Sequence, residues 1–528
     1  LLFLIFLIFT NSSFSQVNSV RLFPSGVYYN SITAAYNDIL AASPISQAYI
    51  IEIQSIYDGS TETRPIQLTE VSGASTSNSI TIRPAVGATG ISISDSIFAT
   101  GIINLNGADY LIFDGRPGGV GTSRELTIIN GSISLTVGTS CIRLLNDATN
   151  NIIRYCNFKN SGKDGNSGTG AVQFATTTGT LGNSNNYVTH NFFSDNDADP
   201  TILPNYNVAS NGNTSTGSGL NSNNVVSNNI LTNFFNRAVS LFGLNGNGWR
   251  IDSNKIYRNT SKTLGPTNCI SVLTAIEFTI YGNEIGGQTF LDSFYLPSNL
   301  QFTGIVSTNG GTGFISKNII NNVRVNSTTA ATLIHAGGTS SNMTISQNSL
   351  LNAVQRSSGE LRGIVLTTGT ITVDSNSISS LSCQSATVTN NNVRGIFGSG
   401  TAANYTIRHN GISNLSTSGS STTFNSTNVN PLNGIFVGIA NSTNISNNNI
   451  YYLSAFNTGA VNTNAFAIGT TNSVTSEIYN NRISYVTNYS TGASSRMGGI
   501  LNINTTGTQN IYNNLISLGN DLGPPFTN

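Results

Sequence analysis

Charged side chains are scarce in this sequence of 528 residues. The 22 Lys+Arg and 22 Asp+Glu make up 8% of the chain, and the formal net charge is +0, whereas soluble domains usually carry about 25% charged residues. A chain without net positive charge lacks the attraction that nucleic acids and anionic membranes exert on basic proteins. We therefore expect no nucleic acid and no membrane surface among its partners.

Other residue types are also rare. Two Met and 12 Pro exclude a Met-rich binding surface and a Pro-rich linker protein. Four Cys, at positions 141, 156, 269 and 383, are too few for a disulfide scaffold. A bridge between Cys141 and Cys156 is one alternative, and burial of all four as small apolar residues is the interpretation we favour. Asn instead accounts for about one residue in seven.

The first 15 residues have the pattern of an export signal. Leu1 to Phe9 is an unbroken apolar run, and Ser13-Phe14-Ser15 places small residues at positions −3 and −1 of a cleavage site. Nine residues are too few to span a bilayer, which needs about 20, and we expect no membrane span elsewhere. The sequence begins without Met or a basic region, so we expect a truncated signal peptide and a secreted or cell-surface protein.

A short phrase recurs along most of the chain: an apolar residue, two residues, Asn, one residue, and a second apolar residue. Twelve copies between Cys156, which occupies the Asn slot in the first copy, and Asn514 give a mean spacing of about 32 residues. A small residue followed by an apolar one, as in Gly363-Ile364 and Gly395-Ile396, precedes most copies. The Asn slots are Asn191, Asn228, Asn254, Asn283, Asn318, Asn348, Asn376, Asn410, Asn448, Asn481 and Asn514.

The repeat predicts a parallel β-helix. Alternation of Ile or Val with polar residues over four to six positions is typical of strands rather than helices. Asn tolerates left-handed backbone angles, which favours it at a sharp bend, and its amides can form a hydrogen-bonded ladder when rungs stack. One rung cannot bury its apolar side chains alone, but stacked rungs form a continuous core.

Residues 31–42 predict a helix that caps the first rung. Ile32, Ala35, Tyr36, Ile39 and Leu40 share one helical face, and Pro44 follows. An apolar helix over the open end of a solenoid protects its strand edges from aggregation. The expected organisation is a signal peptide at 1–15, a segment with the capping helix at 16–48, irregular rungs at 49–140, and regular repeats at 141–528 that end before a second cap.

Two segments carry a resemblance to a known family. Leu105-Asn-Gly-Ala-Asp-Tyr-Leu-Ile-Phe-Asp-Gly-Arg116, followed by Arg124-Glu-Leu-Thr-Ile-Ile-Asn130, resembles secreted right-handed parallel β-helix proteins of Bacteroidota, within the pectin-lyase-like superfamily. The resemblance implies an all-β, right-handed solenoid. Such proteins often end in a type IX secretion sorting domain, which this sequence does not contain. Proteins of this fold include lyases, glycosidases, esterases and adhesins, so the fold does not select an activity.

Charged residues gather in the loops after the first four Asn slots. The acidic members are expected to hold calcium: Asp164, Asp195, Asp197 and Asp199. Lys163, Arg237 and Arg258 are the candidates for removing a proton next to a substrate carboxylate, as a calcium-assisted polysaccharide lyase requires, and Lys262 lies close by in sequence. The alternative interpretation is a solvated loop whose charges neutralise each other.

Two further sets of residues share positions in successive repeats. Arg362 and Arg394 each precede a Gly-Ile pair, which predicts either a carboxylate-binding stripe or solvated surface. Tyr281, Tyr479 and Tyr512 lie two residues before the Asn slot. They can stack on a sugar ring or on each other.

The sequence therefore favours a secreted or cell-surface β-helix scaffold that acts in adhesion or glycan binding without catalysis, as a monomer. Its expected partner is a polysaccharide or a cell-surface glycan. The alternative is a calcium-dependent polysaccharide lyase or related carbohydrate enzyme that uses the loops between residues 163 and 262.

Overall fold

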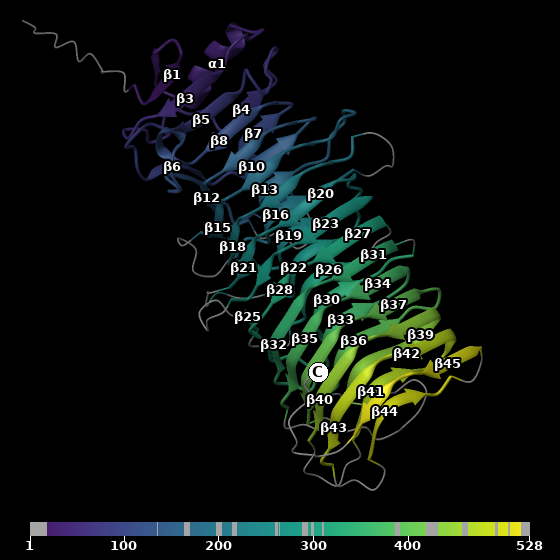
Figure 1. Cartoon of the computed structure of the whole chain (residues 1–528). Coiled ribbons are helices and arrows are strands. Elements are labelled where there is room, and N and C mark those ends of the chain that lie inside the picture. Colours follow the sequence, from purple (N-terminus) through teal and green to yellow (C-terminus); the bar gives the residue numbers. More distant parts are fainter. Residues whose placement is uncertain are drawn as a thin grey trace, which may run out of the picture.

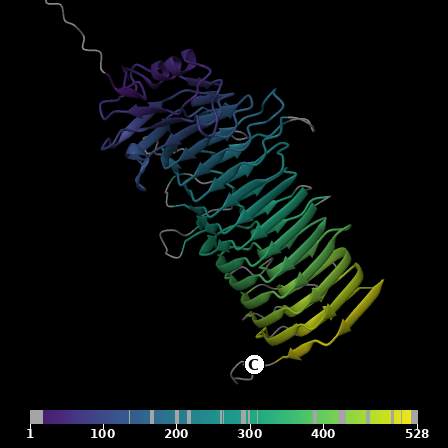
Figure 2. The same ribbon diagram turned by 45° about the horizontal axis from the view of Figure 1, so that its top comes forward.

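The chain forms an elongated β-solenoid of about 12 turns in a computed structural model, with one short α-helix at its N-terminal end (Figures 1 and 2). The structure describes residues 18–134, 136–162, 169–196, 203–213, 219–258, 262, 265–287, 294–296, 300–308, 311–339, 341–385, 391–418, 431–456, 463–490, 495–504 and 507–518. Among them, no helix has the length and hydrophobicity needed to cross a bilayer.

Each regular rung contributes one strand to each of three parallel sheets, which we number I, II and III in their order within a regular rung. Sheet I contains β4 (Ile66–Thr69), β7 (Gly101–Asn106), β10 (Ser140–Leu145), β13 (Gly170–Phe174), β16 (Tyr206–Ser210), β19 (Arg237–Leu241), β22 (Thr267–Val272), β26 (Phe302–Ser307), β30 (Ala331–Ala336), β33 (Leu361–Leu366), β36 (Val393–Ser399), the first part of β39 (Leu432–Ser446), β41 (Asn464–Thr470) and β44 (Arg496–Asn502).

Sheet II contains β3 (Tyr49–Ile53), β5 (Ile80–Pro84), β8 (Leu111–Asp114), β11 (Ile152–Arg154), β14 (Tyr187–Thr189), β17 (Val225–Ser227), β20 (Trp249–Asp252), β23 (Glu277–Tyr281), β27 (Gly311–Ser316), β31 (Ser341–Ser346), β34 (Thr370–Asp374), β37 (Asn404–Arg408), the second part of β39, β42 (Ser473–Tyr479) and β45 (Thr508–Tyr512). At its N-terminal end, β1 (Val20–Phe23) pairs antiparallel with β2 (Tyr28–Tyr29) and with β3.

Sheet III follows the Asn slot of each rung. It contains β6 (Ile91–Asp95), β9 (Leu126–Asn130), β12 (Cys156–Asn160), β15 (Phe192–Asp195), β18 (Ile230–Thr232), β21 (Lys255–Tyr257), β24 (Glu284–Ile285), β25 (Phe294–Leu296), β28 (Ile319–Ile320), β29 (Val323–Val325), β32 (Ser349–Gln355), β35 (Ser377–Cys383), β38 (Gly411–Thr417), β40 (Asn449–Ala455), β43 (Arg482–Asn488) and β46 (Leu515–Ser517).

The Gly-Ile pairs predicted from the sequence lie in the middle of sheet I. Ile364, Ile396 and Ile435 pair in register and are fully buried in the core. The glycines before them permit this packing: a Cβ on Gly363 would lie 2.4 Å from the carbonyl oxygen of Gly395 in the next rung. The recurring small residue is therefore a packing requirement between neighbouring rungs.

The predicted Asn ladder is present between sheets II and III. Asn348 donates its backbone N–H to Asn376 Oδ1 over 3.0 Å, and Asn376 Nδ2 donates to Asn410 Oδ1 over 2.9 Å and to the carbonyl oxygen of Ile345 over 2.9 Å. The backbone N–H of Cys156 donates to Asn191 Oδ1 in the same way. The side chain of each ladder Asn thus satisfies a backbone N–H and a backbone carbonyl of the preceding rung.

Two details of the ladder differ from the sequence prediction. In the rung of β17 the ladder residue is Asn229, which accepts from Asn191 and donates to Asn254, so the choice of Asn228 is wrong by one position. Asn228 instead has a φ of 55°. The left-handed bend falls on the residue before the ladder Asn, as at Ser375 with a φ of 58°. The ladder Asn itself must direct its backbone N–H at the side-chain oxygen of the ladder Asn in the next rung.

The capping helix is confirmed as α1 (Ile32–Ala41). Ser31 accepts a hydrogen bond from the N–H of Ala34 and begins the helix. Ile32, Ala35, Tyr36 and Ile39 are buried on its inner face. The helix lies at the purple end of the rod in Figure 1 and packs against β1, β3 and β4.

Candidate functional site

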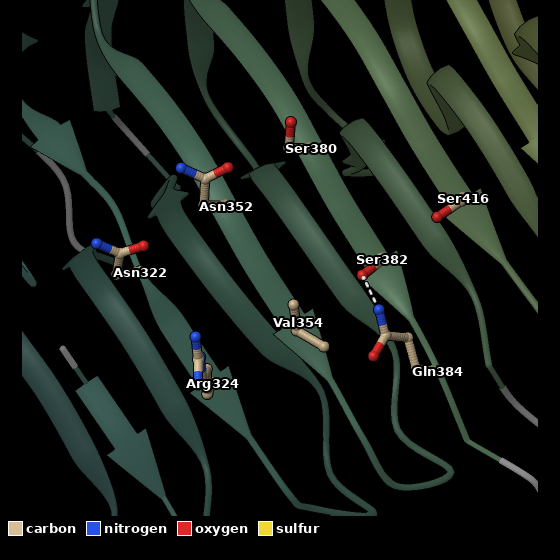
Figure 3. Close-up of a pocket in the computed structure, with 8 residues that line it drawn as sticks. All are labelled: Asn322, Arg324, Asn352, Val354, Ser380, Ser382, Gln384 and Ser416. Carbon is tan, nitrogen blue, oxygen red and sulfur yellow. Dashed lines mark hydrogen bonds between the residues drawn. The ribbon is translucent and has the colours of Figure 1, made fainter. Parts of the chain in front are cut away.

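The outer face of sheet III carries a shallow groove of about 460 Å³. It crosses the consecutive rungs of β29, β32, β35 and β38, and the side chains that line it come from the same positions in each rung (Figure 3). The lining residues are Asn322, Arg324, Asn352, Val354, Ser380, Ser382, Gln384 and Ser416.

A backbone kink in each rung shapes one wall of this groove. The residue four positions after the ladder Asn has a left-handed φ, which is 54° at Asn322, 49° at Asn352 and 57° at Ser380. Asn and Ser are among the residues that adopt this conformation, and Asn does so at the lowest cost after Gly. The kink separates the part of the strand next to the ladder from the part that carries the groove floor.

Strand register aligns the floor and the second wall. Arg324, Val354, Ser382 and Ser416 pair directly in successive rungs, and they point outward between buried neighbours. Gln384, two residues after Ser382, directly follows the end of β35 and donates from Nε2 to Ser382 Oγ over 3.3 Å. Short side chains therefore form the floor from Val354 onward, with longer polar side chains beside them.

The chemistry of the lining favours binding rather than acid–base catalysis. Seven of its eight residues supply amide, hydroxyl and guanidinium groups, the eighth is Val354, and the eight include no Asp, Glu, His, Cys, Lys or Tyr. An uncharged hydroxyl or amide with no base beside it is neither a nucleophile nor a proton carrier near neutral pH. The same groups are well suited to hydrogen-bond the hydroxyl and carboxylate groups of a sugar chain.

The acidic cluster predicted from the sequence is described only at Asp195. Its carboxylate is buried, forms an ion pair with Lys262 (Nζ–Oδ2 2.5 Å) and accepts from Asn233 over 2.8 Å. Lys163, Asp164, Asp197 and Asp199 lie outside the described residues. No group of three or more His, Cys, Asp or Glu that would hold a metal ion is found in the part of the chain that the structure describes.

The two arginines predicted to act with this cluster are buried against aromatic rings. Arg237 donates to Tyr206 Oη over 3.0 Å and stacks over Phe242, and burial lowers the pKa of its guanidinium. Arg258 is 5% exposed and donates to the carbonyl oxygen of Phe235, while its Nε and Nη1 have no hydrogen-bond partner. Burial lowers the pKa of Arg258 to about 10.

Arg362 and Arg394 share one carboxylate, that of Glu360. Arg362 donates to Glu360 Oε2, and Arg394 Nη2 lies 3.7 Å from Oε1. Burial raises the pKa of Glu360, but the guanidinium groups of Arg394 and Arg362 outweigh it and leave the pKa below its usual range. Both guanidinium groups also stack over Phe397. The predicted carboxylate-binding stripe is therefore occupied by a carboxylate of the chain itself.

The remaining sequence candidates have local roles. Tyr479 and Tyr512 stack on each other at 5.0 Å, and Tyr281 lies beside Lys317. All four cysteines are free and buried, so the bridge between Cys141 and Cys156 is absent.

Sequence reasoning missed the groove because its residues are ordinary Asn, Ser and Gln in a chain rich in all three. The signal that would have identified it is positional: counting four, six and eight residues from the ladder Asn gives Asn352, Val354 and Arg356 in one rung and Ser380, Ser382 and Gln384 in the next. Two short Asn ladders next to the start of the sheet II strands, Asn151 to Asn186 to Asn224 and Asn183 to Asn221, were missed for the same reason.

Comparisons with known proteins reveal no family assignment: no family model and no curated protein matches the chain. Solved structures with some likeness include the A-module of a mannuronan C-5 epimerase from Azotobacter vinelandii (12% identity, TM-score 0.30, 80% of this chain and 90% of that chain). Others are the surface adhesin PfbA of Streptococcus pneumoniae (11%, 0.30, 71% and 88%) and an E. coli bacteriophage tailspike protein in complex with a pentasaccharide (12%, 0.31, 80% and 71%).

Proposed function

We propose that the protein is a secreted or cell-surface β-helix scaffold that binds a glycan in the groove on sheet III, without catalysis, and acts in adhesion. The groove carries this proposal: four consecutive rungs present amide, hydroxyl and guanidinium groups in register. The export-like segment at residues 1–15 supports the location.

The repeat explains why such a surface suits a glycan. Equivalent positions recur at about 4.8 Å from rung to rung, so hydrogen-bonding groups are spaced regularly along the rod. Each side chain comes from a strand whose inner residues are packed in the core, as Leu381 and Leu415 are beneath Ser382 and Ser416. A rigid scaffold holds these groups in place and lowers the entropic cost of binding.

Binding of the purified chain to an array of polysaccharides tests the proposal, with Ser382→Trp as the variant that fills the groove floor. Thr372→Trp is the matched control, since Thr372 lies in the same rung on sheet II and is also partly exposed. We expect Ser382→Trp to abolish binding and Thr372→Trp to retain it, with both variants folded by circular dichroism. Equal binding by the two variants would show that the groove is not the site.

The same preparations separate binding from catalysis. Bound polysaccharide is expected to be recovered at its original length after prolonged incubation with calcium. Release of unsaturated sugars that absorb in the ultraviolet would contradict the proposal and support the calcium-dependent lyase, whose acidic residues were predicted at 164 and 195–199.

A further inference from the structure

The column of outward side chains that forms the groove floor continues for two rungs past the residues that line the groove, and the side chains beside it change there. Register carries the floor from Ser416 to Ser454 and Thr487, which hydrogen-bond to each other over 3.0 Å. These side chains are short and point outward, like Ser382 and Ser416 before them. The floor therefore crosses six rungs, from β29 to β43, over about 24 Å at the usual strand spacing.

Aromatic side chains replace the polar walls in these last two rungs. On the side of the backbone kink, Tyr452 and Tyr485 have φ values of 57° and 53° and stack at 4.8 Å. On the other side, Phe456 and Tyr489 stack at 5.1 Å with an interplanar angle of 5°.

Backbone hydrogen bonds show that the second wall is one continuous column. Gln384 donates its N–H to Gln355, Phe456 to Thr417, and Tyr489 to Ala455, always to the last residue of the preceding strand in sheet III. Arg356 and Ser418 donate in the same way. The two walls are four residues apart on each strand, about 13 Å, which is wide enough to admit a sugar ring above the floor.

The aromatic walls are open to solvent. Tyr452 is 37% exposed, Phe456 48% and Tyr489 51%. Large exposed apolar side chains gathered at one place usually mark a binding surface. Aromatic side chains that combine an apolar ring with a hydroxyl contact both the C–H and the O–H groups of sugars.

The charge of this face has one sign. Strands β29, β32, β35, β38, β40 and β43, with the residue that follows each, contain Arg324, Arg356 and Arg482 and no Asp or Glu. In a chain with equal numbers of acidic and basic residues, this strip is positive. Arg324 and Arg356 lie at the polar end of the groove, opposite the aromatic end.

Resting on the proposed glycan binding, we propose that the ligand is an extended acidic polysaccharide that lies along the axis of the solenoid. Its anionic groups meet Arg324 and Arg356, and its sugar rings pass between the walls formed by Tyr452, Tyr485, Phe456 and Tyr489. Carboxylate and sulfate groups both fit a guanidinium, and chains of either kind provide the test.

Substitutions within a column test the proposal without disturbing the fold, because each new residue already occupies the same column one or two rungs away. Arg324→Ser and Arg356→Gln remove the charge, following Ser382 and Gln384. Tyr452→Asn and Phe456→Ser remove the aromatic walls, following Asn414 and Ser418. Tyr479→Ser, following Ser446, removes an aromatic stack from sheet II as the control.

Binding is measured by calorimetry with polygalacturonate, dextran sulfate and neutral dextran, each as short and long oligomers. We expect the double arginine variant to bind the acidic chains at least tenfold more weakly, and added salt to weaken wild-type binding. The aromatic double variant should bind long oligomers at least about fivefold more weakly, and short oligomers almost as tightly as wild type. Tyr479→Ser should leave the affinity for both unchanged. Preference for polygalacturonate or for dextran sulfate identifies the anionic group.

Two results separate this inference from the proposed function. Binding of neutral dextran as tight as that of the acidic chains, with no effect of the arginine swaps, overturns the acidic polysaccharide but leaves glycan binding intact. Equal affinity for short and long oligomers overturns the axial track. Absence of binding to every glycan of a broad array contradicts the proposed function itself.

Discussion

Replacing Asn376 by Ala tests whether the Asn ladder stabilises the solenoid. The substitution leaves the buried backbone N–H of Asn348 without its acceptor and removes the donations from the Asn376 amide to Ile345 and Asn410. An unsatisfied buried donor costs about 1–3 kcal/mol, and each lost hydrogen bond about 1 kcal/mol. The expected loss in the free energy of unfolding is therefore about 3–5 kcal/mol.

Urea denaturation followed by far-ultraviolet circular dichroism measures this loss, and fluorescence of the single Trp, the buried Trp249, reports on a distant rung. Asn441→Ala is the control, because Asn441 is exposed and its side chain donates only to Asn404, which is partly exposed. We expect the control to stay within about 0.5 kcal/mol of wild type. An equally small effect of Asn376→Ala would refute the ladder's role in stability.

Asn376→Asp should make the free energy of unfolding depend on pH, and the direction of that dependence follows from the ladder. A carboxylate here would face the two oxygens that accept from the Asn376 amide and would be buried, so its pKa in the folded state should rise above the usual value of about 4. The folded state then binds a proton more tightly than the unfolded state, and stability falls as pH rises through this range. The variant should therefore approach wild-type stability at acidic pH and be weakest at neutral pH.

Three further substitutions test other parts of the structure. Gly395→Ala places a Cβ 2.5 Å from the carbonyl oxygen of Gly434 and should cost about 1–3 kcal/mol in unfolding measurements, and a neutral effect would contradict the packing explanation of the Gly-Ile pairs. Arg258→Met removes a buried guanidinium, two of whose nitrogens have no hydrogen-bond partner, and should raise the free energy of unfolding by about 1–3 kcal/mol. A lower denaturation midpoint in the variant would show that the buried charge is compensated. Glu360→Gln should cost about 3 kcal/mol at neutral pH. Since the pKa of Glu360 is lowered in the folded state, the stability that its carboxylate contributes is present above the unfolded pKa of about 4.3 and is lost as pH falls. The free energies of unfolding of wild type and variant should therefore converge in acid. A difference that stays constant with pH would exclude the ion pair as the cause.

The part of the fold that could be predicted from sequence rests on contacts that repeat. The apolar residues, the Asn slot and the small residue of sheet I recur in most copies because each rung packs against an equivalent rung. The helix at 32–41 was predictable because its apolar face and its Ser31 cap are local features.

The sites were harder to predict because they depend on alignment between rungs whose loops differ in length. The phrase around residue 228 fits two adjacent Asn, and only the hydrogen bonds to Asn191 and Asn254 select Asn229. For Arg362 and Arg394 the sequence left a carboxylate-binding stripe and solvated surface as alternatives, and only the structure shows that both contact Glu360.

The sequence by itself thus determined the architecture of this protein, since strand alternation, Asn ladder and glycine packing are properties of a single repeat. Only the tertiary structure decided which outward side chains share a surface. Arg324 and Tyr485 are 161 positions apart in the numbering, yet they lie along one face of sheet III because parallel pairing aligns equivalent residues of successive rungs. Stacking in register brings scattered polar and aromatic residues onto one face of the solenoid.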